Sequence, residues 1–258
     1  MPSHIAMTTV FIGFGTVVNI ATVLVGTVLG LVIGNRLGER TRSTVTDVLG
    51  LFTIVIGAFS ILPLLRDPLA TAVPGGAASV VILVALLAGA MVGSALRLED
   101  RVEDLAVWIR RRAIGGADPA GDTARFVNAF VTSTLLFCVG PMAILGSLQD
   151  GLGQGASLLL TKAVLDGFAA IAIASALGAG VLAAGGAVGL YQGTLTLLAV
   201  LLGRLLDPVL VDSLSVAGGV ILVGLGIRLL GLKAIRVADL IPALVLAPVL
   251  VWLVQRLG

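Results

Sequence analysis

Two stretches of the sequence lack any charged side chain and are long enough to cross a membrane. Residues 5–35 carry no charge, and residues 167–203 carry none either. A helix needs about 20 apolar residues to cross roughly 30 Å of hydrocarbon. Hydrophobic residues make up 58% of the chain and charged residues 12%, against roughly 45–50% and about 25% in globular proteins. The sequence therefore predicts an all-α, polytopic transmembrane helix bundle, with residues 1–258 forming a single integral membrane domain.

The apolar runs predict eight membrane-spanning helices. Gly185 and Gly186 divide the long run into two spans, because one helix of that length would exceed the bilayer thickness. The predicted spans are residues 10–34, 45–65, 78–96, 126–149, 161–183, 187–205, 213–230 and 238–257. The seventh is the shortest, so seven spans with one re-entrant segment remain an alternative. No basic region precedes the first run, which we therefore expect to be a retained span rather than a signal peptide.

The lysines and arginines favour one orientation of the bundle. Segments rich in these residues remain in the cytoplasm. With the N-terminus outside, twelve of the 16 basic residues fall in cytoplasmic segments, namely Arg36, Arg40, Arg42, Arg97, Arg101, Arg110, Arg111, Arg112, Arg125, Arg228, Lys233 and Arg236. The outer segments then hold Arg66, Lys162, Arg204 and Arg256. We therefore predict a multi-pass protein with its N- and C-termini outside.

The longest segment between spans has two parts. Val102, Leu105, Ala106 and Ile109 recur at helical spacing within residues 99–113, with charged residues between them. This pattern predicts an amphipathic helix on the cytoplasmic membrane interface. A flexible linker follows over residues 114–124. We interpret the helix as a topological tether, and a regulatory or partner-binding role is the alternative.

A weak internal repeat relates spans one to three to spans six to eight. A shift of 169 positions pairs Gly50 with Gly219 and Gly57 with Gly226, among other identities. An odd number of spans separates the two copies, so they would have opposite orientations in the membrane. Inverted repeats are typical of secondary transporters, whose substrate site lies near the midplane. Chance similarity among apolar helices is the alternative interpretation.

One face of the first span carries small and polar side chains. Thr22, Gly26, Gly30 and Gly34 recur at a spacing of four, which allows another helix to approach closely. Asn19 lies one turn before them, and a buried amide in lipid must find a hydrogen-bond partner. Asn19 is therefore a candidate site residue, and an interhelical hydrogen bond is its alternative role.

The fourth span contains a predicted break. Pro141 removes a backbone donor, its ring clashes with the preceding turn, and Gly140 stands beside it. Freed carbonyl groups at membrane depth are tolerated where they are buried in protein or line a wet cavity. Thr132 and Ser133 place hydroxyl groups one to two turns earlier, and Cys138 lies between. These five residues are candidates for a substrate or ion path, and an ordinary proline kink is the alternative.

Spans five and six supply further polar residues. Lys162 and Asp166 are four residues apart and can pair on one helix face. A carboxylate within a membrane is a functional candidate by default, so Asp166 is expected to titrate, to bind a cation, or simply to neutralise Lys162. Gln192, Thr194 and Thr196 form a polar patch that would face the same cavity or serve helix packing.

The remaining chemistry of the chain excludes several functions. Arg228 and Asp239 flank the turn between the last two spans, where we predict a structural ion pair at the membrane edge. The chain has one cysteine and one histidine, His4, which excludes a cysteine–histidine metal site or a serine–histidine–aspartate triad. We therefore expect no enzymatic activity, no metal and no cofactor. The net charge of +2 gives no sign of a nucleic-acid partner.

Several motifs resemble a bacterial membrane family catalogued as domain of unknown function 554 (DUF554). The central motif comprises residues 135–147 and 149–152, and further motifs lie at residues 97–100, 162–168, 191–193 and 237–244. The resemblance covers nearly the whole chain. Arg228 and Asp239 stand where the family pattern has asparagine, which supports a contact between the last two spans and argues against a catalytic role there. Membership implies a bacterial cytoplasmic (inner) membrane protein, and transport is the usual hypothesis for its function.

These features together predict a membrane transport protein, a carrier or channel for a small solute or ion within the lipid bilayer. The predicted repeat, the broken fourth span and the polar residues of spans one, four, five and six support this function. The alternative is a non-transporting scaffold or sensor that acts through the cytoplasmic amphipathic helix. Small-residue faces would suit a homo-oligomer or internal packing equally well.

Overall fold

A computed structural model of the chain describes residues 11–34, 36, 38–65, 68–73, 77–114, 120–138, 141–202 and 207–257. The elements in these ranges are α1 (Phe14–Gly34), α2 (Glu39–Ile61), η1 (Leu62–Leu65), α3 (Leu69–Ala72), α4 (Ala78–Ala95), α5 (Leu98–Ile114), α6 (Ala120–Cys138), α7 (Pro141–Gly151), α8 (Ser157–Leu177), α9 (Gly180–Leu202), α10 (Pro208–Leu229), η3 (Val237–Leu240) and α11 (Ala243–Leu257). All of these elements are helical, which confirms the predicted all-α class.

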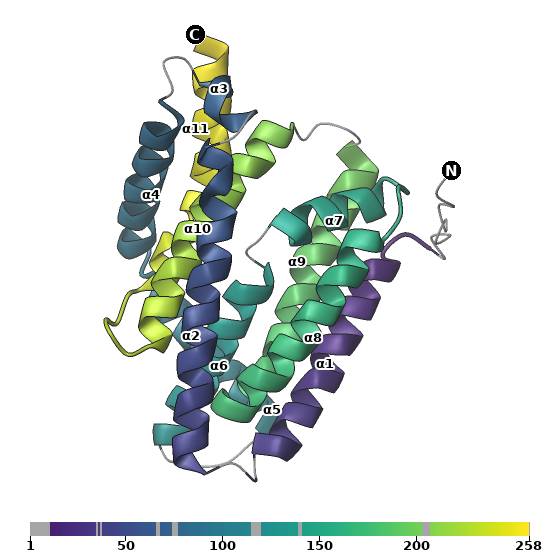
Figure 1. Ribbon diagram of the computed structural model, residues 1–258, viewed down its shortest axis with the longest axis vertical. Coiled ribbons are helices and arrows are strands. Elements are labelled where there is room, and N and C mark those ends of the chain that lie inside the picture. The colour runs from purple at the N-terminus through teal and green to yellow at the C-terminus, as the bar shows by residue number, and fades with distance from the viewer. Residues whose placement is uncertain are drawn as a thin grey trace.

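The described part of the chain contains seven helices that are long and apolar enough to cross a membrane. The helices α6 and α7 pass the same test as a pair, with a bend of 59° between them, so the number of spans is the predicted eight if the pair is one broken span and the alternative seven if it is a re-entrant segment. An even number agrees with Figure 1, where the start of α1 and the end of α11 are both the helix ends that point away from α5. The predicted seventh span is α10, an unbroken helix of 22 residues. The interrupted span is therefore the fourth, and not the seventh.

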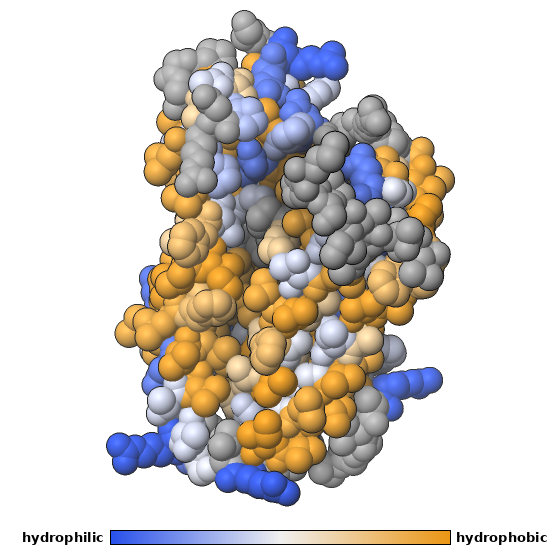
Figure 2. Space-filling model, turned by 45° about the vertical axis from the view of Figure 1, so that its right-hand side comes forward, coloured by the Kyte–Doolittle hydropathy of each residue, from blue (hydrophilic) through white to orange (hydrophobic). Residues whose placement is uncertain are grey.

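The outer surface matches a lipid environment. Figure 2 shows a broad apolar surface between the two ends of the molecule, where hydrophilic side chains gather. Large apolar side chains such as Phe59, Phe168 and Leu190 are exposed on it. An apolar surface of this extent is unfavourable in water and favourable in hydrocarbon. Helices suit this environment because they satisfy the backbone hydrogen bonds within each segment.

The spans form two groups, which Figure 1 shows side by side. In one group α2 packs along α10, and α4 packs against α11. In the other group α1 packs along α8 and also contacts α9, while α6 and α7 pack against α9. The largest helix contacts are therefore made between segments that are far apart in the sequence.

Glycines on α1 hold this helix unusually close to α8. A Cβ atom added to Gly34 would lie 2.6 Å from the carbonyl oxygen of Ser175. A Cβ at Gly26 or at Gly30 would overlap the backbone of α8 in the same way. The predicted packing role of the first-span glycines is confirmed, because only a hydrogen at these positions allows the two backbones to touch.

The α2–α10 pair is built from glycines as well. A Cβ at Gly57 would lie 2.7 Å from the Gly219 carbonyl oxygen, and one at Gly219 would lie 2.7 Å from that of Gly57. A Cβ at Gly226 would lie 2.6 Å from the carbonyl oxygen of Gly50. The predicted repeat makes Gly50 equivalent to Gly219 and Gly57 equivalent to Gly226. The contact of Gly50 with Gly226 is therefore equivalent to the contact of Gly57 with Gly219. A two-fold relationship between the copies would produce this pattern, and the repeat itself stays a prediction.

The helix ends that carry most of the arginines lie at one end of the molecule, together with α5 (Figure 1). The predicted amphipathic segment is helical over Leu98–Ile114. The predicted linker over residues 114–124 is shorter than expected, because residues 120–124 already belong to α6. Residues 115–119 lie outside the described residues.

Candidate functional site

Four polar side chains from three helices meet within the group of α1, α8 and α9. The side-chain nitrogen of Asn19 donates to Asp166 Oδ2 over 3.0 Å and to Gln192 Oε1 over 3.2 Å. The Lys162 ammonium forms a hydrogen-bonded ion pair with the same oxygen of Asp166. All four side chains are buried. We refer to Asn19, Lys162, Asp166 and Gln192 as the polar cluster.

The sequence places these side chains through helical spacing. Lys162 and Asp166 are one turn apart on α8 and therefore share a face. Asn19 stands on the α1 face that also carries Gly15 and Gly26, whose lack of a side chain brings α8 within reach of the amide. The predicted ion pair on α8 is present, and three candidates from separate spans, Asn19, Asp166 and Gln192, are joined as one unit.

The hydrogen bonds of the cluster leave two polar atoms open. A carboxylate only accepts, so the Asn19 nitrogen must face Asp166, and its second proton points to Gln192. Asn19 Oδ1 and Gln192 Nε2 are consequently buried without a partner among the described residues. Leaving a buried polar group unsatisfied costs about 1–3 kcal/mol. One acceptor and one donor of the cluster are thus left without a hydrogen bond among the described residues.

Two further threonines lie one turn from the amides of the cluster, and of these the sequence pattern indicated Thr196 together with Gln192 but not Thr16. Thr16 lies three residues before Asn19 on α1, and Thr196 lies four residues after Gln192 on α9, so each shares a face with its neighbour. Both hydroxyl groups are buried and have no partner within the described ranges. The spacing of three residues from Asn19 is the sequence signal that would have found Thr16.

Asp150 is a second buried carboxylate that the sequence did not mark as functional. Its two oxygens accept hydrogen bonds from the backbone nitrogens of Gly13 and Gly15, each over 3.2 Å. These N–H groups belong to the start of α1, which favours a negative charge. Asp150 therefore fixes the end of α7 to the start of α1, which is a structural role.

The charged side of the cluster lines a groove between the two helix groups. The groove has a volume of about 570 Å³ and is bounded by α2, α8 and the ends of α6 and α7 that face each other across the break. Most of its lining is apolar, as at Phe52 and Ile56, and Lys162 and Asp166 are its charged residues. The groove opens to the outer surface, because the exposed side chains of Phe59 and Phe168 line it as well. Lys162 Nζ also lies 5.9 Å from the ring centre of Phe137 on α6. We refer to this space as the α2–α8 groove.

The predicted break in the fourth span lies beside this groove. Helix α6 ends at Cys138 and α7 begins at Pro141, and Leu136 and Met142 from either side line the groove. Gly140 lies outside the described residues. Cys138 is half-buried, and its electrostatic interaction with Lys162 and Asp166 places it close to the charged pair.

The hydroxyl candidates of the fourth span are only partly suited to a path. Ser133 donates to the Ala129 carbonyl oxygen over 2.5 Å, so its hydroxyl is used within its own helix. Thr132 is buried and contacts Asn128 Oδ1 at 3.5 Å.

The sixth-span candidate Thr194 is exposed on the outer surface of α9 and donates to the carbonyl oxygen of Leu190. The structure therefore exposes Thr194 and buries Thr196 on the face of α9 that carries Gln192, because a shift of two residues turns a helical side chain by about 200°.

The predicted ion pair between Arg228 and Asp239 is wrong. Arg228 pairs with Glu99, the second residue of α5. Glu99 Oε2 accepts from the Ala238 backbone nitrogen over 2.8 Å, and Asp239 Oδ1 accepts from the Glu99 backbone nitrogen over 3.0 Å. Arg228 and Asp239 are thus joined through Glu99, which lies 129 and 140 residues away in the sequence. Sequence spacing could not reveal this partner.

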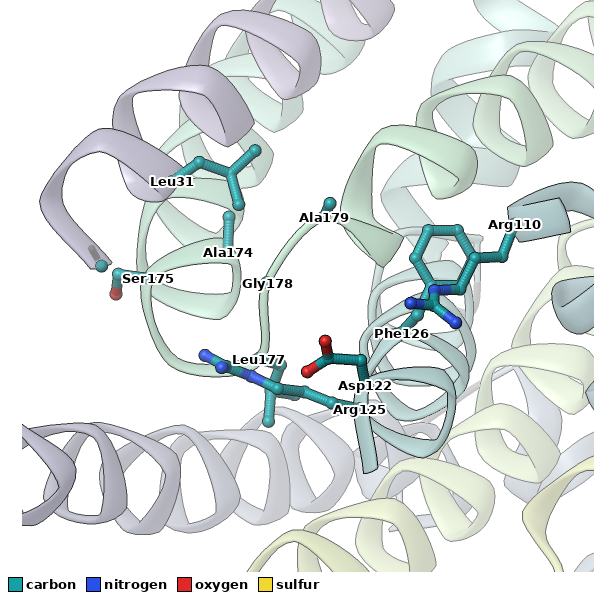
Figure 3. A pocket seen from close by; sticks show the side chains of 11 residues that line it. Leu31, Arg110, Asp122, Arg125, Phe126, Ala174, Ser175, Leu177, Gly178 and Ala179 are labelled. Carbon is teal, nitrogen blue, oxygen red and sulfur yellow. The ribbon is translucent and has the colours of Figure 1, made fainter. Parts of the chain in front are cut away.

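A smaller polar pocket lies at the arginine-rich end. Its volume is about 190 Å³, and Arg110, Asp122 and Arg125 contribute its charges. Figure 3 shows Arg125 extending from α6 towards the last turn of α8, where it donates to the Ala176 carbonyl oxygen over 2.9 Å. A cation at a helix C-terminus is stabilised by the free carbonyl groups there. Arg125 therefore acts mainly as a cap for α8.

Within the described ranges, the histidine, cysteine, aspartate and glutamate residues form no group of three that could hold a metal ion. The side-chain groups of the polar cluster are one carboxylate, one ammonium and two amides. Such groups bind a solute through charge and hydrogen bonds. The arrangement suits reversible binding of a charged or polar solute.

Comparison with known proteins identifies the family of the chain. A protein family described as "Protein of unknown function (DUF554)" matches residues 14–252. The chain is 30% identical over 233 residues to the "Uncharacterized protein YqgA" of Escherichia coli (strain K12), covering 90% of this chain and 94% of that protein. It is 24% identical over 245 residues to the "Uncharacterized membrane protein YdfK" of Bacillus subtilis (strain 168), covering 95% and 98%. No solved structure matches the chain significantly.

Proposed function

The chain belongs to the membrane protein family DUF554, and from this premise we propose that it transports a small solute or ion across the membrane. The observation that carries the proposal is the polar cluster of Asn19, Lys162, Asp166 and Gln192 at the α2–α8 groove. Ionisable residues within membrane spans are costly and usually mark substrate paths or proton relays. A purely structural cluster would satisfy its own hydrogen bonds, whereas this one leaves Asn19 Oδ1 and Gln192 Nε2 open.

The broken fourth span supports the same function. Discontinuous helices in transporters present their free backbone groups to a substrate near the midplane. Here the end of α6 and the start of α7 line the groove that also contains Lys162 and Asp166. A helix break without such a role would be expected where backbone groups are covered by neighbouring helices.

The glycine contacts between α2 and α10 support an inverted repeat within the proposed transporter. The pairs Gly50–Gly226 and Gly57–Gly219 exchange under the predicted two-fold relationship. Two similar halves with opposite orientations would allow two conformations of similar energy, open to opposite sides. The groove between the helix groups is where such a change would alter access.

We further propose that the end of the molecule that holds α5 faces the cytoplasm, in a bacterial cytoplasmic membrane. Basic residues concentrate at that end, and the positive-inside rule assigns it to the cytoplasmic side. Both described ends of the chain then face outward, because α1 begins and α11 ends at the helix ends that point away from α5 (Figure 1). On this assignment the chain acts as a transporter rather than an enzyme, and it needs no cofactor.

The test is solute flux into liposomes that contain the purified protein. The screen includes Na⁺, K⁺, H⁺, chloride and small organic acids, with wild type beside Asp166→Asn. Lys233→Met is the control, because Lys233 is an exposed cation outside the helices. We expect a flux that wild type and Lys233→Met support and Asp166→Asn loses.

The outcomes separate the candidate roles. A flux that Asp166→Asn leaves unchanged would keep transport but remove Asp166 from the path. Absence of flux for every solute, from protein shown to be folded and inserted, would overturn the proposal. The scaffold function through α5 would then become the better hypothesis.

A further inference from the structure

We propose that the α2–α8 groove binds an organic monoanion with an apolar body, and that the anion binds together with one proton carried on Asp166. The inference rests on the proposed transport function and names the substrate class of the same site. Three features of the groove support it: its lining, its positive groups, and the free oxygen of Asp166.

The lining determines the body of the ligand. The groove volume of about 570 Å³ falls within the range of small-ligand pockets, about 300–1,000 Å³. Its walls are mostly aliphatic and aromatic side chains from α2 and α8, among them Phe52, Ile56 and Leu165. A compact inorganic ion would leave these walls without contacts. An apolar group of several carbon atoms would fill the space.

Positive groups in the groove determine the charge of the ligand. An ammonium has three N–H donors, and Lys162 forms one hydrogen bond, to Asp166, within the described part of the chain. Lys162 lines the groove, so a ligand there lies near its ammonium group. The first residues of α7, Met142 and Ala143, line the groove as well. Backbone N–H groups in the first turn of a helix have no intrahelical acceptor and favour an anion.

Asp166 supplies the position for the proton. The two hydrogen bonds that it accepts both end on Oδ2, which leaves Oδ1 without a donor from the residues that the structure describes. A proton from solution would add to Oδ1. Lys162 would keep its own proton and exchange its partner, from the carboxylate of Asp166 to the anionic group of the ligand.

Charge balance requires the proton and the anion to bind together. The empty site contains one cation, Lys162, and one anion, Asp166, and is neutral. An anion alone would make it negative, and a metal cation alone would make it positive. Either net charge within the membrane is costly. An anion with one proton leaves the loaded site neutral, as the empty site is.

Few other ionisable groups face Asp166. Cys138 on α6 lies near the pair, and Tyr191 on α9 interacts with Cys138. Helix α1 carries no ionisable residue between its bounds, and the charged residues of α2 are confined to residues 39–47. On α7, Asp150 is committed to the start of α1. Asp166 and Lys162 are therefore the groups that control the charge of the groove.

The experiment measures binding of 1-hexanesulfonate to the full chain in phosphatidylcholine nanodiscs by titration calorimetry. The sulfonate stays ionised between pH 5.5 and 8.5, so any pH dependence belongs to the protein. Two buffers with different ionisation enthalpies report the protons taken up on binding. We expect affinity to fall up to about tenfold per pH unit as pH rises, with uptake approaching one proton. Hexylammonium and 1-hexanol serve as cationic and neutral controls and should bind at least tenfold more weakly.

Variants separate the two charged groups. Asp166→Asn mimics the protonated carboxyl group and should bind the sulfonate at every pH without proton uptake. Lys162→Met should lose binding, and Lys233→Met should behave as wild type. Zero proton uptake by wild type, or hexylammonium binding more tightly than the sulfonate, would overturn the inference even if the Lys162 variant fails to fold. Flux of any solute without this binding would retain the transport function and reject the substrate class. Proton-linked binding without flux would retain the ligand class and reject the transport function.

Discussion

Asn19 donates its side-chain N–H to Asp166 over 3.0 Å, although 147 residues separate the two positions. The bond crosses from α1 to α8 at a place where glycines remove the side chains that would keep the helices apart. Asn19 and Lys162 donate to the same carboxylate oxygen, Asp166 Oδ2, and Asn19 also donates to Gln192. The position of Asp166 therefore depends on packing between the first and fifth spans.

Replacing Asn19 by leucine should abolish the flux that wild type supports. The change removes one donor from Asp166 and leaves both polar ends of the Gln192 amide unsatisfied, at a cost of about 1–3 kcal/mol in unfolding free energy. SDS-induced unfolding and liposome flux measure the two effects. Thr194→Val is the control, because Thr194 is exposed and bonds only within α9. Equal flux in Asn19→Leu and Thr194→Val would remove Asn19 from the site.

Breaking the Lys162–Asp166 pair should destabilise the protein more than removing both charges. The side chains are 8% and 9% exposed, and loss of one partner from a buried pair costs about 3–5 kcal/mol. Lys162→Met and Asp166→Asn should each lower the midpoint of SDS-induced unfolding. The double variant should recover part of the loss, because no uncompensated charge remains. Strictly additive losses would show that the two charges do not interact.

Alanine at Gly26 should weaken the packing of α1 on α8. The added methyl group would overlap the Gly167 carbonyl oxygen, and overpacking of this kind costs about 1–3 kcal/mol. Gly193→Ala is the matched control, since a Cβ there meets nothing within 4 Å. The control should leave stability unchanged or raise it by up to about 1 kcal/mol, because alanine is the better helix former. Thermal unfolding of the two variants in the same detergent tests the difference, and equal stability would contradict the close contact.

Asp239 should act as a hydrogen-bond acceptor for α5, not as the ion-pair partner of Arg228. Asp239→Asn keeps a side-chain oxygen for the Glu99 backbone nitrogen and should change stability by less than about 0.5 kcal/mol. Asp239→Leu removes this acceptor and should cost about 1 kcal/mol, as loss of a helix cap does. Unfolding of both variants decides between the roles. A large loss in Asp239→Asn would restore the direct charge pair.

Cysteine labelling should place the two ends of the molecule on opposite sides of the membrane. Lys233→Cys and Gln255→Cys introduce exposed thiols at the two ends, each in a Cys138→Ala background. We expect an impermeant maleimide to label position 255 from outside intact cells and position 233 only in inverted vesicles. The opposite pattern would reverse the orientation and contradict the positive-inside assignment.

Much of the fold could be predicted because lipid simplifies the rules for folding. Long apolar runs must become helices in a bilayer, so the span count and approximate bounds followed from residue type alone. The glycine spacing of α1 indicated a packed face for the same reason. The break near Pro141 also followed from local chemistry, because proline cannot donate its backbone hydrogen bond.

The sequence by itself determined that the chain spans a membrane as a helical bundle, that α1 has a close-packed face, and that Lys162 pairs with Asp166. These properties depend on neighbours within one or two helical turns. The tertiary structure alone decided that Asn19 meets Asp166 and Gln192, that Thr196 is buried while Thr194 is exposed, and that Arg228 pairs with Glu99. These contacts depend on which helices lie side by side and how each is rotated. Packing energies summed over whole helices determine that arrangement, and no local pattern in one segment records it.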